Sequence, residues 1–167
     1  MNLPRLEIRN IKVSCFLDED FPEPGIYEGN NGIMTIYDSD KRLINITGIK
    51  TLNHLYTMES NIQKVFNVKI KKTKIDAIML SRRVRNKRFS ERKYLKVIEK
   101  YEHIFKRDYN HEMFHSPWFK SNGRRGSFNV FSTGSCTVMG VKSVSDIKLI
   151  EEILDEAFCE ENEIKIT

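Results

Sequence analysis

The sequence of 167 residues lacks long apolar runs and contains little cysteine. No apolar run approaches the roughly 20 residues that a membrane-spanning helix needs, and residues 1–9 carry no signal-peptide pattern. We therefore expect an intracellular protein with no membrane partner. The three cysteines, Cys15, Cys136 and Cys159, are widely spaced and form no CxxC pair, which indicates reduced, partly buried thiols.

Motifs of enzymes are almost absent. There is no Gly-rich phosphate loop and no arrangement of a nucleophile beside a base. The exception is HEMFH at residues 111–115, which fits the pattern of a zinc peptidase, with Glu151 as a conceivable distant ligand. That chemistry requires a continuous helix, whereas Pro117 follows almost at once. We expect no enzyme, no cofactor and no metal, and keep a zinc hydrolase as a third hypothesis.

Charge is unevenly distributed along the chain. Residues 69–107 contain fifteen Lys or Arg and four Asp or Glu, within a net charge of +5. Residues 146–163 contain eight acidic residues and one Lys. The basic middle favours a polyanionic partner, although a solvated lysine-rich surface is the alternative. The acidic stretch indicates a different contact.

The second half of the sequence repeats the first. Gly48 and Gly140 are 92 residues apart, as are Lys50 and Lys142, and Phe66 and Phe158. Each copy alternates apolar and polar residues around a polar turn and then continues as a helix, which predicts a β-hairpin followed by a helix. The hairpin strands are expected at residues 33–37 with 43–51, and at 128–131 with 136–143.

Further elements precede each hairpin. Residues 6–16 and 74–81 are expected to be strands, and residues 91–106 a helix. Two prolines within residues 17–25 forbid that helix in the first copy. We expect an α+β fold of one domain, with repeats of about 5–70 and 71–160. The repeats would form one twisted antiparallel sheet, with helices on one face and the other face free.

Two segments resemble the TATA-binding protein family. Residues 129–143, NVFSTGSCTVMGVKS, are similar to the family motif apolar-apolar-Phe-x-Ser-Gly-Lys-x-x-x-Thr-Gly-Ala-Lys. Residues 7–15, EIRNIKVSC, resemble its first-strand pattern Lys-Ile-Gln-Asn-Ile-Val-Gly-Ser-Cys. The resemblance extends from about residue 6 to 158. It implies a saddle-shaped fold whose concave sheet binds and bends double-stranded DNA through the minor groove, with apolar wedges between base steps.

The resemblance also implies which residues contact DNA. Phe131 and Phe114 fall on the wedges of the second copy, Tyr37 on one wedge of the first, and Phe21 near the other. Asn10 corresponds to an asparagine that contacts bases at the centre of the site. The remaining implied contacts, on the sheet face or beside phosphates, are Lys12, Asn45, Thr47, Met79, Lys120, Arg125, Asn129, Thr137 and Met139.

Several residues depart from the family pattern. Ala77 replaces the second central asparagine, so the two halves cannot read bases equivalently. Tyr37 replaces a phenylalanine, and amides replace aliphatic residues at two sheet positions. Without the motif, Asn10 could be a satisfied surface amide and Phe131 a core residue. The second hypothesis is therefore a protein-interaction subunit of a transcription complex that keeps the fold without specific DNA binding.

The resemblance implies a transcription initiation factor. Its DNA partner would be an AT-rich promoter, and its helices at residues 52–66 and 144–158 would recruit a B-type initiation factor or an RNA polymerase subunit. The divergence and the Lys/Ile/Asn-rich composition suggest a large DNA virus or an AT-rich parasite as the source. The corresponding location would be the nucleus or a cytoplasmic viral factory.

Overall fold

The computed structural model describes residues 5–29, 32–84, 91–108, 118–121, 125–131 and 133–163. Nine strands form one sheet in the order β2-β3-β4-β1-β5-β9-β8-β7-β6. The pairings with an assigned register are all antiparallel. The predicted α+β class with a single antiparallel sheet is therefore confirmed.

The chain divides into two compact units. The N-terminal unit is Ile8–Ile78, and the C-terminal unit is Met79–Thr167 together with Met1–Glu7. The N-terminal unit contains β1 (Glu7–Leu17), β2 (Gly25–Gly29), β3 (Gly32–Tyr37), β4 (Asp40–Ile49), α1 (Leu52–Phe66) and most of β5 (Ile70–Arg82). The C-terminal unit contains the end of β5 and then α2 (Glu91–Glu99), β6 (Phe105–Asp108), β7 (Trp118–Ser121), β8 (Ser127–Val130), β9 (Cys136–Val141) and α3 (Val144–Glu163).

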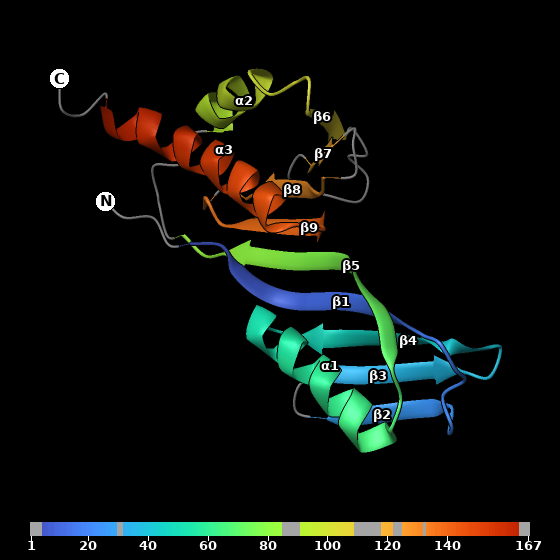
Figure 1. Ribbon diagram of the computed structural model, residues 1–167. Coiled ribbons are helices and arrows are strands. Elements are labelled where there is room, and N and C mark those ends of the chain that lie inside the picture. Colours follow the sequence, from blue (N-terminus) through green and yellow to red (C-terminus); the bar gives the residue numbers. More distant parts are fainter. Residues whose placement is uncertain are drawn as a thin grey trace. The chain divides into compact units, whose positions relative to one another are not determined.

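In the N-terminal unit, α1 covers one face of the sheet (Figure 1). Thr51 caps this helix, because its side-chain oxygen accepts a hydrogen bond from the His54 backbone at 3.1 Å. The helix ends at Asn67 in the left-handed conformation, with φ 51°. The apolar side chains of alternate strand positions are buried beneath it: Ile11, Val13, Cys15, Met34, Ile36, Ile44 and Ile46.

In the C-terminal unit, α2 and α3 pack against each other (Figure 1). Ser143 caps α3 by accepting a hydrogen bond from the Asp146 backbone at 3.3 Å. Three aromatic rings form the centre of the core: Phe128 lies 5.0 Å from Phe105 and 5.6 Å from Phe119, measured between ring centroids. Buried aromatic contacts of this kind stabilise the unit beyond the area that they remove from water.

The hairpins of the two units are equivalent, as the repeat predicts. Gly48 and Gly140 each lie in the second strand of their hairpin, and their φ angles are positive, 89° and 71° respectively. Gly48 lies against Gly32, because a Cβ added to it would meet the Gly32 Cα at 3.3 Å. Gly140 lies beside Gly126 in the same way, at 3.9 Å. Close backbone approach and positive φ together explain why glycine occupies these positions.

Other element boundaries differ from the predictions. Strand β2 was not predicted, and neither were β6 and β7. The helix expected over residues 91–106 ends at Glu99, because Tyr101 donates to the Ile98 carbonyl at 2.8 Å in a tightened turn and Phe105 then pairs with Ser121 in β6. Helix α3 continues beyond residue 158 to Glu163. No helix among the described residues has the length and apolar composition that crossing a membrane requires.

Candidate nucleic-acid interface

The strand face opposite α1, here called the open face of the N-terminal unit, carries alternate residues of β1, β3 and β4. Strand side chains alternate between faces, so Lys12, Ser14 and Phe16 point away from the buried Val13 and Cys15. The registers arrange this face in rows across the strands. Ser14 lies opposite Asn45, Asn45 opposite Thr35, and Thr35 opposite Ile26.

Further residues of this face lie on both sides of that row. On one side, Thr47 pairs with Ile33. On the other side, Phe16 pairs with Leu43, and Tyr37 ends β3, where a register shift pairs it with Asp40. We call Phe16, Leu43 and Tyr37 the apolar row. The Tyr37 side chain is 59% exposed and that of Phe16 39%, so both rings are available to a ligand.

The amide of Asn10 is held by its neighbours. Its Nδ2 donates to the Thr47 hydroxyl at 3.2 Å, and its Oδ1 accepts from the Gly48 backbone at 2.6 Å. The sequence left open whether this amide is satisfied within the protein, and the structure shows that it is. One Nδ2 hydrogen can serve Thr47 while the other is directed elsewhere, so the amide retains capacity for an acceptor on a base edge.

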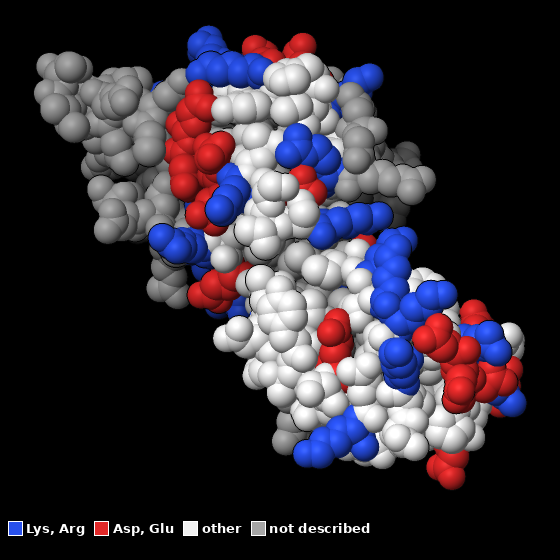
Figure 2. Space-filling view, in the orientation of Figure 1, with Lys and Arg blue, Asp and Glu red and all other residues white. Residues whose placement is uncertain are grey.

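Charges on the open face have both signs. Lys12 is exposed beside Asn10 and would attract phosphates. Asp76 accepts a hydrogen bond from the Ser14 hydroxyl at 2.5 Å, which places a carboxylate against the same face. Figure 2 shows Lys and Arg side chains gathered along part of β5 on the face that carries the helices.

In the C-terminal unit, four predicted contact residues lie on the strand face opposite its helices, here called its open face. Met79 and Met139 are 37% and 45% exposed, and Thr137 is half-buried between them and the core. Phe131 is 44% exposed at the turn after β8. Its backbone is fixed, because Phe131 N donates to the Ser135 carbonyl and Phe131 O accepts from Gly134 N, both at 2.8 Å.

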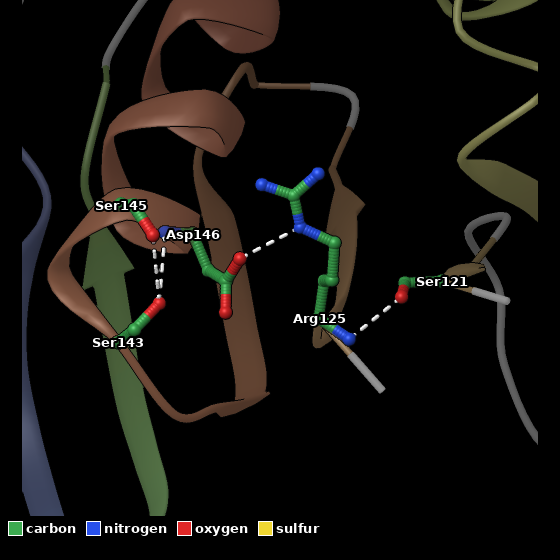
Figure 3. A network of polar contacts seen from close by, with 5 residues as sticks. All are labelled: Ser121, Arg125, Ser143, Ser145 and Asp146. Atoms are coloured by element: carbon green, nitrogen blue, oxygen red, sulfur yellow. Dashed lines mark hydrogen bonds and ion pairs between the residues drawn. The ribbon is translucent and has the colours of Figure 1, made fainter. Parts of the chain in front are cut away.

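Arg125, a predicted phosphate contact, forms an ion pair within the protein. Its Nε donates to Asp146 at 2.7 Å, and its backbone nitrogen donates to the Ser121 hydroxyl at 2.7 Å (Figure 3). Asp146 belongs to the first turn of α3, so the guanidinium is held beside the helix. Figure 3 shows its two Nη atoms pointing away from the carboxylate. A phosphate would have to compete with an ion pair that is already formed.

Two further predictions are corrected by burial. The Phe21 ring is 1% exposed and packs on Phe66 at 4.9 Å, so it belongs to the core and cannot be a wedge in this conformation. Asn129 is 2% exposed, so its amide is not presented at the surface. Phe114, the side chain of Lys120 and the HEMFH segment lie outside the described residues. Those predictions stay predictions.

Two arginines at the end of β5, within the basic middle of the sequence, have different environments. The Arg82 side chain is fully buried and pairs with Asp155 at 2.7 Å, which excludes it from phosphate binding. Arg83 is exposed. In the described part of the chain, no group of three His, Cys, Asp or Glu side chains is placed to hold a metal ion.

Sequence reasoning missed three exposed apolar residues of the open face: Phe16, Ile26 and Ile33. Phe16 could have been found, because it shares the parity of Asn10 and Lys12 along β1. Ile26 follows two prolines in a segment where no strand was expected. Its position on β2 depends on the pairing with β3.

Comparison with known proteins supports the fold. No protein-family model and no curated protein sequence matches the chain. Among solved structures, the Methanococcus jannaschii TBP is similar, with a TM-score of 0.62 and 16% sequence identity. The match covers 92% of this chain and 98% of that chain. The chain therefore has the fold of the TATA-binding protein.

Proposed function

We propose that the chain is a TATA-binding-protein-like transcription initiation factor that binds double-stranded DNA with its open faces. One observation supports this most strongly. Large exposed apolar side chains gather on the open faces, in the fold of a DNA-binding protein family: Phe16, Ile26, Ile33, Tyr37, Met79, Phe131 and Met139. A soluble surface rarely gathers so many apolar side chains without a partner.

The minor groove is the site that such a face fits. Apolar side chains cannot read the donor and acceptor code of the major groove, but they can contact sugars and separate base steps. Tyr37 and Phe131 are the exposed rings at the hairpin ends of the two units, where wedges would enter. An AT-rich site is expected, since flexible TA steps reduce the cost of bending.

The helices would recruit the transcription machinery. Figure 2 shows acidic side chains gathered beside α3, where Glu152 is exposed and Glu151 half-buried. A basic surface on a B-type initiation factor or a polymerase subunit would complement them. The protein would act without enzymatic chemistry, inside the cell, in the nucleus or a viral factory. The viral source rests on composition alone and stays a prediction.

A DNA titration tests the proposal. The protein is titrated against AT-rich and GC-rich duplexes at two salt concentrations, with end-labelled DNA to report bending. Tyr37→Ala and Phe131→Ala should each weaken binding by about tenfold and reduce the bend, since an aromatic contact with a base is worth about 1–3 kcal/mol. Val65→Ala is the matched control, because Val65 is 72% exposed on α1. Equal binding by all four proteins would contradict the proposal.

Three observations favour the second candidate, a protein-interaction subunit without specific DNA binding. Asp76 places a negative charge against the open face, Asp146 engages Arg125, and Thr47 engages Asn10. Under this function, binding would be weak and governed by salt, and Phe131→Ala would leave activity in a transcription extract intact. The zinc hydrolase stays the third hypothesis and requires stoichiometric metal in the purified protein.

A further inference from the structure

We infer that Phe16 is a further DNA-contacting residue, and that it gives the N-terminal unit a mainly apolar mode of contact. The inference rests on the proposed function and adds to it a residue that the family pattern does not supply. It begins from the apolar row. Phe16 pairs with Leu43, two residues beyond the pair of Ser14 and Asn45, whereas the register between β3 and β4 shifts after Thr35, so that Tyr37 pairs with Asp40 at the end of the same hairpin.

The fold does not require an aromatic residue at position 16. The neighbouring residues Cys15 and Leu17 point into the core and are 0% and 5% exposed, whereas Phe16 points the other way. Its cross-strand partner in β4 is Leu43. A threonine or lysine would satisfy strand geometry here without exposing apolar surface. An exposed phenylalanine at this point therefore indicates contact with a ligand.

The equivalent row in the C-terminal unit has different chemistry. The family resemblance aligns Asn10 with Ala77, which lies 67 residues later in the sequence. The same offset aligns Phe16 with Arg83. The hairpin repeat of 92 residues matches Leu43 with Ser135. The structure supports this register, because Val84 N donates to the Ser135 hydroxyl at 3.0 Å and the hydroxyl donates to the Val84 carbonyl at 3.2 Å. The C-terminal row is thus Arg83, Ser135 and Phe131.

The two rows should contact DNA in different ways. Phe16, Leu43 and Tyr37 present apolar surface to sugars and to the faces of unstacked bases, which involves no counterion release. Arg83 is exposed and charged, so it suits a phosphate and releases counterions when it binds. The contribution of Phe16, Leu43 and Tyr37 would therefore depend little on salt, and that of Arg83 strongly.

The test measures affinity for one AT-rich duplex at several salt concentrations. Phe16→Ala and Phe16→Thr should each weaken binding by about tenfold with an unchanged salt slope. Arg83→Ala should weaken binding and reduce the slope by about one. Phe16→Thr keeps a strand-forming residue, so it reports the contact even where alanine loosens β1. Val65→Ala controls for loss of exposed apolar surface.

The outcomes separate this inference from the proposed function. Unchanged binding by both Phe16 variants, together with a loss for Tyr37→Ala, would overturn the inference and leave the proposed function standing. Unchanged binding by the Phe16, Tyr37 and Phe131 variants would overturn both. A Phe16 effect that vanishes at higher salt would also overturn the inference, because an apolar contact does not depend on counterions.

Discussion

The Ser14 hydroxyl donates a 2.5 Å hydrogen bond to the carboxylate of Asp76, on the open face proposed to contact DNA. A carboxylate at this position opposes a polyanion. Asp76→Asn should therefore strengthen DNA binding by about two- to fivefold at low salt, with the gain shrinking as salt rises. An asparagine can still accept the Ser14 hydrogen bond.

Filter binding or fluorescence titration at two salt concentrations checks this prediction. Glu59→Gln is the matched control, since it removes one charge from α1 and produces the same change in net charge. Equal gains in the two variants would show that only net charge matters. A loss of affinity in Asp76→Asn would show that the carboxylate orients the face for binding.

The ion pair of Arg82 and Asp155 predicts a large effect on stability. The Arg82 side chain is fully buried and its Nη1 lies 2.7 Å from the carboxylate of Asp155. Asp155→Ala would remove a carboxylate that pairs with a buried guanidinium, and should lower the free energy of unfolding by about 3–5 kcal/mol. Asp20→Ala, which breaks the exposed Arg42 pair, should cost at most about 1 kcal/mol. Urea unfolding measures the free energy of unfolding of both variants, and equal losses of free energy would contradict the prediction.

Glu156 predicts a pH dependence in acid. Hydrogen bonds from Lys100 at 2.8 Å and Tyr101 at 2.7 Å lower the pKa of Glu156 below its ordinary value of 4.5. Since the pKa is lower in the folded state, the stabilisation is present above pH 4.5 and is lost as the pH falls through the lowered value. Glu156→Gln should be less stable than the parent at neutral pH, and the difference should disappear in acid. Urea unfolding of both proteins from pH 7 to pH 3 measures this difference in the free energy of unfolding. A difference that stays constant over this range would contradict the prediction.

The two buried thiols are expected to react slowly with a disulfide reagent in the folded protein. Burial raises the pKa of Cys15 and Cys136, although hydrogen bonding with Thr73 and the charge of Arg82 respectively act against the rise. Thiolate is the reactive form, so both thiols should resist a disulfide reagent at pH 8 until the protein unfolds. The variant Cys159→Ser leaves only these two thiols. Rapid labelling of the native variant would contradict the prediction, because it would show that the core around one of these thiols opens readily.

The duplicated hairpins and their helices followed from the sequence because each has a strong local pattern. Thr51 and Ser143 cap the helices that follow the hairpins, and alternation gave the buried faces of β3, β4 and β9 correctly. Strand β2 was missed because Pro22, Pro24 and Gly25 weaken a strand pattern, and only pairing with β3 makes it extended. The end of α2 was missed because apolar residues continue at helical spacing into β6.

The exposure of candidate contact residues was predictable at the hairpin ends and not where it depends on loops or on distant contacts. Tyr37 and Phe131 lie at equivalent exposed hairpin ends. Counting residues across the loop before β2 placed Phe21 near a wedge, whereas the side chain packs in the core. Arg125 is engaged by Asp146, a residue that lies 21 positions away and is brought near only by the tertiary fold.

Strand β5 has a consequence for synthesis on the ribosome. Its residues up to Ile78 complete the N-terminal unit, and Met79–Arg82 belong to the C-terminal unit. Their neighbour β9 is made only after α2 and three more strands. Throughout that interval the nascent chain carries an unpaired strand edge, which is a template for aggregation. The rate of translation between β5 and β9 therefore becomes a determinant of how much protein reaches the native state.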